Sequence, residues 1–417
     1  MKTFWKILRY GILTIIALVL VAIIYLSISF SKLSFRDNFS VAADYSPYFN
    51  EDYEMLSESF ENLSLELLNK YRNVEYRKVI VPSQDSDKLT FGVCYVPAQK
   101  NNKNLLILSS GVHGVEGFVG HAVQSLFIDR FLDEELIENT GVLLIHSLNP
   151  YGLKHMRRVT DNNVDLNRNS PSTDNLYSTV NEGYPKVYEL INPQKKVKVS
   201  SVENRFFFLK AVNEIRKVSM PVLRQAVLQG QYQYPKGLYF GGLSPEPQID
   251  SLRPIIERIC DPYQTILAID LHTGYGERGV LHFFQDPVDK ERMDKIESLF
   301  AGYTIDWGNT EDFYTVTGDF TDFVEALNSE KQFYPMTIEY GTLNSQTTMG
   351  SLKSIHIMIL ENQGQQFGYA SERDSIKVKH DLLEMYFPAS VNWRNHIMEQ
   401  SKMVFDSIIP RFTSGNY

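Results

Sequence analysis

Apolar positions along the 417-residue chain fall into short continuous runs separated by amphipathic or polar stretches. Four of the runs end in small or polar residues, a pattern typical of buried central strands: NLLILSSG, GVLLIHSLNP, YQTILAIDLHTG and YPMTIEYGT. Two earlier segments predict strands that pair antiparallel, VEYRKVIVP and KLTFGVCYVP. Helical spacing of apolar residues occurs in YEMLSESFENLSLELLNKY, and GHAVQSLFIDRFLDEEL also predicts a helix. Strands that alternate with helices predict an α/β sheet covered on both faces.

The N-terminal segment has a different pattern. Residues 11–30 contain no charged side chain, and this is about the length that a helix needs to cross a membrane. The run is longer than the apolar part of a secretory signal and lacks an A-x-A pattern, which favours an uncleaved signal anchor. The three basic residues before it predict a cytoplasmic N-terminus, although Lys32 and Arg36 weaken the charge asymmetry. We expect a single-pass protein of the plasma (inner) membrane with its body on the periplasmic or extracytoplasmic side, where a cleaved signal would also deliver it.

These patterns divide the chain into four parts. We expect a basic cytoplasmic N-terminus (residues 1–9), a transmembrane signal anchor (10–30), a juxtamembrane linker (31–44) and one folded domain (45–417). Within that domain, residues from about 170 to 236 are polar and turn-rich at first and then predict one or two helices. We interpret this segment as an insertion between core strands and not as a second domain.

Composition narrows the classes of function. Hydrophobic residues make up 43% and aromatic residues 12% of the chain, which indicates a packed body and excludes a disordered one. The net charge is -9, and the chain lacks the electrostatic footprint of a nucleic-acid-binding protein. Cys94 and Cys260 are the only cysteines and cannot form a thiolate zinc site. We expect both to be buried apolar residues, and the sequence leaves open whether they pair.

Polar side chains follow three of the predicted strands. His113 and Glu116 come after the first buried strand, and His272 and Glu339 lie at the ends of two later ones. Because ligands of open α/β sheets bind beyond the carboxyl ends of the strands, we expect these residues at one edge. Two histidines and a carboxylate form a catalytic zinc set, and a further carboxylate is what such a site needs as a general base. Each residue alone has an ordinary structural explanation, since H-x-x-E recurs by chance.

The order and surroundings of these residues resemble the zinc carboxypeptidase family of the carboxypeptidase A type. The similarity covers most of residues 75–345 and rests on SGVHGVEG, NPYG, the arginine pair 157–158, NVDLNRN, DLHTGYG and TIEYGT. Two further segments look more like a bacterial subgroup described as a domain of unknown function, DUF2817: GQYQYPKGLYFGG and YFPASVNWRNHI. The resemblance implies a mixed, mostly parallel eight-stranded twisted sheet with helices on both faces, preceded by the membrane helix.

The resemblance also implies the metal and the base. His113, Glu116 and His272 would bind one Zn²⁺ per chain, which would polarise the scissile carbonyl. Glu339 would take a proton from the attacking water and pass it to the leaving nitrogen.

Basic and amide side chains would contact the substrate. Arg158 would stabilise the developing oxyanion, with Arg157 as the alternative for this role or as a further substrate contact. Asn167 and Arg168 would bind a terminal carboxylate, for which a planar guanidinium is well shaped. Surface ion pairs are the ordinary explanation of Arg157 and Arg168. We expect Asp165 to orient the loop and not to take part in catalysis.

The segment YTVTGDFTD, residues 314–322, resembles the mobile tyrosine loop of the family. Tyr314 would close over the substrate near the scissile amide; otherwise it is simply packed. Thr321 falls at the floor of the specificity pocket. Asp319 could face the same pocket and favour a substrate side chain with an ammonium group, such as lysine, arginine or diaminopimelate.

The sequence therefore predicts a membrane-anchored, zinc-dependent carboxypeptidase that hydrolyses the C-terminal amide bond of peptides, cell-wall peptides being one candidate class. The first alternative is a zinc-dependent deacylase of N-acyl amino acids, of the aspartoacylase or desuccinylase type. The second is a non-catalytic binding protein on the same fold. The tyrosine loop favours peptide cleavage, because deacylating relatives usually lack it, and Glu339 argues against binding alone. The substrate, the oligomeric state and the choice between zinc and another divalent metal stay open.

Overall fold

The computed structural model describes residues 2–83, 88–308, 316–415 and 417. Its centre is one eight-stranded sheet with the strand order β1-β2-β4-β3-β5-β8-β6-β7. The strands are β1 (Glu75–Val81), β2 (Leu89–Val96), β3 (Asn104–Ser110), β4 (Thr140–His146), β5 (Thr265–Thr273), β6 (Leu281–Gln285), β7 (Ile305–Trp307) and β8 (Gln332–Tyr340).

The sheet is mixed, as expected. β4, β3, β5 and β8 are parallel neighbours at its centre, β1 and β2 continue it antiparallel at one edge, and β6 pairs antiparallel with β8 and parallel with β7 at the other. The four buried runs and the first two strands were predicted from the sequence, whereas β6 and β7 were not. β7 has three half-buried residues, too few for periodicity to indicate a strand.

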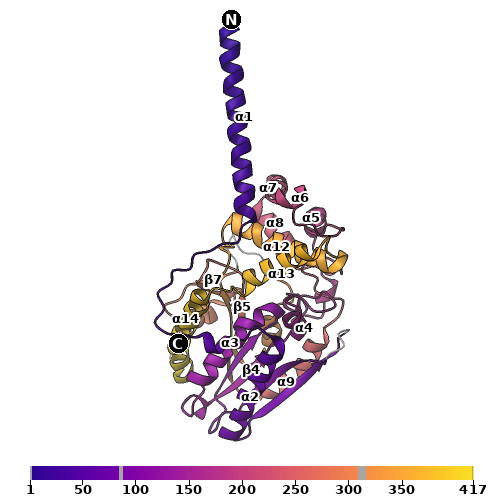
Figure 1. The fold of residues 1–417 in the computed structure, drawn as a ribbon. Helices are drawn as coiled ribbons and strands as arrows, with labels where there is room; N and C mark the ends of the chain where they lie inside the picture. Colours follow the sequence, from indigo (N-terminus) through magenta and orange to yellow (C-terminus); the bar gives the residue numbers. More distant parts are fainter. Residues whose placement is uncertain (1, 84–87, 309–315, 416) are drawn as a thin grey trace.

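Helices cover both faces of the sheet (Figure 1). Leu106 and Leu108 of β3 pack with residues of α2, α3 and α14 in one hydrophobic cluster, whereas Leu105 and Ile107 pack with α9 and α11 in another. Cys94 belongs to the first cluster and Cys260 to the second, and both are free thiols. The helices are α1 (Lys2–Ser31), α2 (Tyr53–Lys70), α3 (Gly117–Arg130), α4 (Pro150–Lys154), α5 (Tyr184–Ile191), α6 (Val202–Arg205), α7 (Phe207–Val218), α8 (Met220–Leu228), α9 (Pro247–Cys260), α10 (Lys290–Leu299), α11 (Phe320–Ala326), α12 (Thr348–Phe367), α13 (Glu372–Tyr386) and α14 (Val391–Ser414).

The chain between β4 and β5 builds a helical layer away from the sheet. Residues 170–236, expected to be an insertion, contain α5 to α8, which lie together beside the base of α1 in Figure 1. The sequence predicted one or two helices in the second half of this segment. The structure divides that half into three, with a break at Ser219, whose φ is 70°, and places α5 in the first half.

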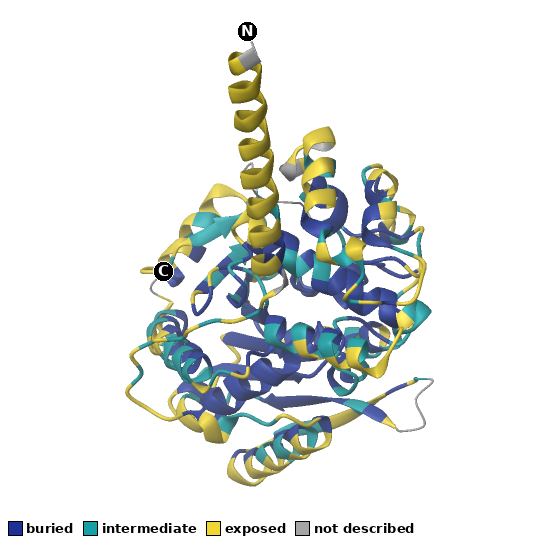
Figure 2. Ribbon diagram, turned by 45° about the horizontal axis from the view of Figure 1, so that its top comes forward, coloured by how far each residue is buried: buried dark blue, intermediate teal, exposed yellow. Residues whose placement is uncertain are grey.

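The N-terminal helix α1 projects from the body, and its residues are exposed along most of its length (Figure 2). Residues Thr3–Phe30 form the one helix in the described part of the chain that is long and apolar enough to cross a membrane, a test that a signal sequence also passes. The end of α1 is fixed to the body: Phe30 is 3% exposed and its ring packs against Phe207, Phe208 and His356.

The expected linker, residues 31–44, is also fastened to the body. Arg278 donates two hydrogen bonds of 2.7 Å to the carboxylate of Asp37. Asn392 exchanges hydrogen bonds with the backbone of Phe39, whose ring stacks on His396 at 4.1 Å. These contacts hold the segment in place although it contains no long helix or strand.

Two further histidines are buried in the core under α2. His121 Nδ1 lies 3.0 Å from His146 Nε2, and the His146 ring stacks on Phe60 at 4.1 Å. Burial lowers the pKa of His121 to about 4 and that of His146 well below its ordinary value. The folded protein therefore keeps both rings neutral.

These histidines predict a loss of stability in mild acid. Between the unfolded pKa of 6.5 and the folded value of about 4, the unfolded chain binds more protons at His121, so lowering the pH favours unfolding. Between pH 7 and pH 5 the loss from this residue is about 2 kcal/mol. Urea unfolding in detergent at about pH 5 and pH 7 measures it. His121→Gln should reduce the difference and His380→Gln, at an exposed histidine, should not; equal differences in all three proteins would contradict this origin.

Candidate metal centre

The first two candidate ligands lie in a tight loop after β3. Gly111 has a positive φ of 68°, and a Cβ there would lie 2.8 Å from the backbone that follows β4, so the turn requires glycine. At Gly114 the chain passes so close to α4 that a Cβ would lie 2.3 Å from the Cα of Gly152. The loop is therefore held closely against α4, with His113 and Glu116 directed to a common point.

Neighbouring strands supply the other two residues. His272 is the penultimate residue of β5 and Glu339 that of β8, and the two are direct partners in the parallel register. β3, which leads to His113, is the other neighbour of β5. The topology thus brings the four candidate residues to one edge, where the carboxyl ends of parallel strands meet.

Three of these side chains form a buried cluster whose ligand atoms lie within 4.8 Å of one another. His113 Nδ1 is 2.9 Å from Glu116 Oε1, His272 Nδ1 is 3.1 Å from Glu116 Oε2, and the two Nδ1 atoms are 3.0 Å apart. The second carboxylate oxygen also accepts a hydrogen bond from the backbone N–H of Thr273 at 2.8 Å. Two imidazoles and one carboxylate form the kind of ligand set found in catalytic zinc sites.

The outer nitrogens of both rings face buried carboxylates. His113 Nε2 lies 3.1 Å from Asp165 Oδ1, and His272 Nε2 lies 2.5 Å from Asp270 Oδ2. Because an ionised carboxylate only accepts, each Nε2–H donates, and a neutral ring then has its lone pair on Nδ1. Two lone pairs and the Glu116 carboxylate then face one another, an arrangement of acceptors that a cation between them stabilises. The residues therefore fit a divalent metal ion.

The charges around the cluster also favour a cation. Burial alone would raise the pKa of Glu116, but His113 and His272 outweigh it and lower that pKa. Burial alone would lower the pKa of His272, but Asp270 and Glu116 raise it well above its ordinary value. The His272 ring therefore holds a proton readily when no cation is bound, and a metal ion would take the place of that proton.

Glu339 lies beside the cluster without joining it. It lines one cavity together with His113 and His272, and the backbone N–H of Tyr275 donates to its Oε2 at 3.4 Å. Burial and the negative charge of Glu116 raise the pKa of Glu339 to about 8. A bound cation would offset the charge of Glu116 and favour the ionised form of Glu339, which is the form that a general base needs.

Arg158 reaches the same cavity. Its Nε donates to Asp165 Oδ2 at 2.9 Å, and its guanidinium lies 3.6 Å from Glu116 Oε1. Asp165 therefore binds both Arg158 and His113. The sequence predicted only that it orients the loop. The position of Arg158 suits the stabilisation of negative charge that develops beside the cluster.

Arg157, in contrast, is not brought to the cavity. Its Nε donates to Glu361 of α12 at 2.8 Å and its NH2 group to Asn163 at 3.2 Å, and the residue is 2% exposed. A guanidinium held by a buried carboxylate is not free to bind substrate. The expected role of Arg157 in the site is therefore corrected to a buried structural ion pair.

Asn167 and Arg168 line the cavity, but their side chains are partly engaged. Asn167 donates to Asp319 Oδ2 at 2.9 Å and accepts from the backbone N–H of Phe320. Arg168 donates from Nε and NH2 to the carbonyl of Leu228 and from NH1 to its neighbour's carbonyl. Of the five N–H donors of a guanidinium, two remain for a ligand.

Arg224 is a cavity residue that the sequence did not indicate. It lies on α8 and lines the cavity of about 910 Å³ around the cluster, together with Arg158 and Arg168. Its guanidinium makes no ion pair in the described part of the chain. No motif surrounds it, so only the fold of the helical layer reveals its position.

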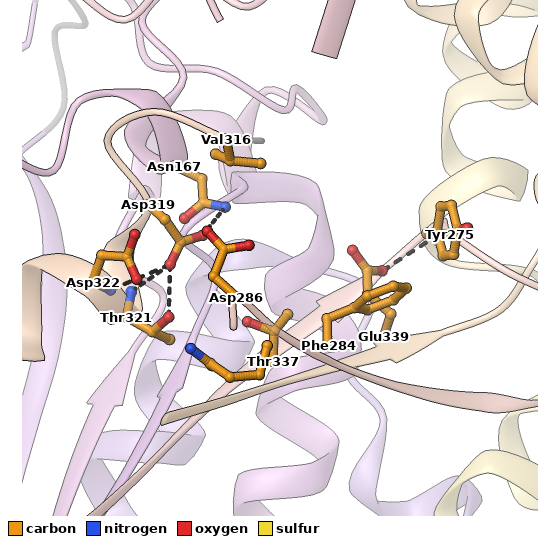
Figure 3. A pocket seen from close by; sticks show the side chains of 11 residues that line it. Asn167, Tyr275, Phe284, Asp286, Val316, Asp319, Thr321, Asp322, Thr337 and Glu339 are labelled. Carbon is orange, nitrogen blue, oxygen red and sulfur yellow. Dashed lines mark hydrogen bonds between the residues drawn. The ribbon is translucent and has the colours of Figure 1, made fainter. Parts of the chain in front are cut away.

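A second pocket adjoins the first and shares Asn167 and Glu339 with it. Figure 3 shows Asp286, Asp319 and Asp322 grouped at one end and Glu339 at the other. Burial and the other carboxylates raise the pKa of Asp322 to about 8, and burial with Asp319 raises that of Asp286 to about 6. Asp286 follows β6 and Asp322 lies in α11, and no sequence pattern indicates either as a pocket residue.

The two predicted pocket residues take part in a helix cap. Asp319 Oδ1 accepts from the backbone N–H and the hydroxyl of Thr321, at 2.8 and 2.7 Å, so its carboxylate begins α11 as well as facing the pocket. Thr321 lines this second pocket. Tyr314 lies outside the described residues.

A family model described as "Protein of unknown function (DUF2817)" matches residues 49–400, and no curated protein matches the chain. Similar solved structures include bovine thrombin-activatable fibrinolysis inhibitor in complex with tick carboxypeptidase inhibitor, at 14% identity over 77% of this chain and 98% of that chain, with a TM-score of 0.41. Carboxypeptidase A from Helicoverpa armigera has 12% identity over 78% and 73%, with 0.39. Succinylglutamate desuccinylase from Chromobacterium violaceum has 13% over 72% of each, with 0.34. Because the identities and the TM-scores are this low, the similarity assigns no activity to this chain.

Proposed function

The chain belongs to the DUF2817 family, and from its metal centre we propose that it is a membrane-anchored, zinc-dependent carboxypeptidase that hydrolyses the C-terminal amide bond of peptides. One observation carries the proposal: His113, Glu116 and His272 converge as acceptors beside a second, half-buried carboxylate, Glu339, which is not one of the clustered ligands. A binding site for a metal needs the first three residues, and only hydrolysis needs the fourth.

His113, Glu116 and His272 would hold the ion, which supplies Lewis acidity toward water and the scissile carbonyl. Glu339 would take a proton from the attacking water and deliver it to the amide nitrogen as the C–N bond breaks. Arg158 would stabilise the negative charge that develops on the carbonyl oxygen. The two remaining donors of Arg168 would bind the terminal carboxylate of the substrate.

We further propose that α1 stays attached as a signal anchor and that the body lies on the periplasmic side. The apolar span supports this, and so does the packing of Phe30 on Phe207, a contact that would be lost if α1 were removed. Intact mass of the mature protein and resistance to carbonate extraction test this part.

The acidic pocket predicts a preference for cationic C-terminal side chains. Asp286 and Asp322 are partly buried, and burial and the neighbouring carboxylates oppose their ionisation. An ammonium or guanidinium group of the substrate would offset this and stabilise the ionised carboxylates. Asp322→Asn should lower kcat/KM for peptides ending in lysine or arginine by roughly 10- to 100-fold, since a hydrogen bond to a charged group contributes about 1.5–3 kcal/mol. Peptides ending in leucine should change little.

Asp306→Asn is the control for that prediction, because Asp306 is a half-exposed carboxylate outside the pocket. Asp319→Ala is less suitable, since it removes the cap of α11 and would lower stability as well. An unchanged ratio between lysine and leucine substrates in Asp322→Asn would show that the pocket does not select charge.

A peptide library tests the reaction itself. The full chain in detergent is the appropriate sample, because residues before position 40 contact the body. We expect release of single C-terminal residues that stops with chelator and returns with zinc. Release of acyl groups with peptides untouched would select the deacylase, and stoichiometric metal without turnover of any amide would select a binding protein.

A further inference from the structure

Helices α6 to α8 present an unusual surface next to the base of α1. Val202, Leu209, Val212 and Val222 are 72%, 38%, 41% and 48% exposed. On α7 the opposite side packs inward through Phe207, Phe208 and Ala211. The outer side of these helices therefore carries apolar side chains that the body does not cover.

The same segment concentrates positive charge. Residues 195–228 contain eight lysines and arginines and two acidic residues, a net charge of +6 within a chain whose total is -9. The two acidic residues, Glu203 and Glu214, pair with lysines of the segment. Arg205, Lys210 and Arg216 are exposed and make no ion pair in the described part of the chain. Exposed apolar residues among unpaired cations are typical of helices that lie in the interface of an anionic membrane.

The attachment of α1 fixes where this surface lies. The Phe30 ring, at the end of the apolar span, packs on Phe207 and Phe208 at the start of α7, and Lys353 of α12 donates to the carbonyl of Lys32 at 2.7 Å. Figure 1 shows α7 beside the base of α1. If α1 crosses a membrane, α7 therefore starts at the boundary of that membrane.

We propose that α6, α7 and α8 form a docking surface for the headgroups of an anionic lipid bilayer, made of Val202, Arg205, Leu209, Lys210, Val212, Arg216 and Val222. The proposal rests on the anchor in the proposed function and not on the hydrolytic reaction. The docking surface would hold the body against the bilayer, as a second contact besides α1.

The docking surface is connected to the metal centre through α8. This helix presents Val222 outward, and its Arg224 and Leu228 line the cavity around the cluster. The cavity therefore lies behind the helix that contacts lipid headgroups. Substrates held near the membrane would meet this side of the body first.

Depth-dependent fluorescence quenching tests the docking surface with the full chain in vesicles. Cys94 and Cys260 are buried, so a thiol-reactive fluorophore reports on one introduced cysteine, Val212→Cys. Met55→Cys is the matched control, because Met55 is 59% exposed and lies on α2 at the opposite end of the body in Figure 1. We expect lipids with a spin label near the headgroup to quench the first fluorophore and not the second, more strongly when phosphatidylglycerol is added to phosphatidylcholine.

Charge reversal gives the second readout. Arg205→Glu, Lys210→Glu and Arg216→Glu together should remove the additional quenching by phosphatidylglycerol. Equal quenching at the two positions in protein that resists carbonate extraction would overturn the docking surface and leave the anchor intact. Extraction of the protein by carbonate would overturn the anchor and the docking surface together, while peptide hydrolysis would still report separately on the metal centre.

Discussion

Replacing Glu339 by glutamine should lower kcat by roughly 10²- to 10⁴-fold, the range by which positioned general acids and bases accelerate reactions. Glutamine has the same shape as glutamate but cannot take the proton of the attacking water. The backbone N–H of Tyr275 that donates to Glu339 can donate to the amide oxygen equally well. We therefore expect the folded structure to be unchanged.

Two measurements separate a catalytic role from a structural one. The metal content of Glu339→Gln should equal that of the wild type, because this residue is not a ligand. Its thermal stability should be no lower, because removing the charge relieves repulsion with Glu116. Glu330→Gln, at an exposed glutamate that precedes β8, should leave kcat unchanged. Full activity of Glu339→Gln would exclude the proposed base.

The second large effect concerns His272 and its carboxylate partner. His272→Ala removes one of the three donors, so metal content should fall from one ion per chain to none and hydrolysis should stop. Asp270→Asn keeps the ligand but weakens the hydrogen bond that fixes the Nε2–H tautomer. We expect this variant to bind zinc roughly 10- to 100-fold more weakly.

The order of zinc affinities among these variants distinguishes a metal site from a buried network of hydrogen bonds. Competition with a chromophoric chelator gives the zinc affinity of wild type, Asp270→Asn and His272→Ala in turn. Asp306→Asn serves again as the control, since Asp306 lies in β7, away from the cluster. Equal zinc affinity of Asp270→Asn and wild type would show that Asp270 does not orient the ligand.

Much of the fold was predictable because its central strands are strongly apolar. The runs that form β3, β4, β5 and β8 are buried almost throughout, so their composition indicates them. β6 and β7 lie toward the sheet edge and are short, and α5 sits in a polar segment. The fastening of Asp37 and Phe39 depends on partners more than 200 positions away, which no local pattern contains.

The residues of the candidate site also fall into those that the sequence predicted and those that it did not. His113 and Glu116 follow a strand, and His272 and Glu339 lie at the ends of two others. Such strand ends meet predictably at one edge of the sheet. Arg224 reaches the cavity from the helical layer. Asp286 and Asp322 reach the second pocket from the end of β6 and from α11. Their positions depend on how these elements pack. For Arg157 and Arg158, adjacent in sequence, only the identity of their acidic partners, Glu361 and Asp165, decides which one faces the cavity.

Anomalous diffraction from crystals of the purified protein, with X-ray fluorescence to identify the element, examines the metal centre most directly. We expect a single zinc peak at about 2.0–2.2 Å from Nδ1 of His113, Nδ1 of His272 and a carboxylate oxygen of Glu116. Hydrolytically active protein with no metal among these three residues, or with its metal bound elsewhere, would contradict the proposed centre.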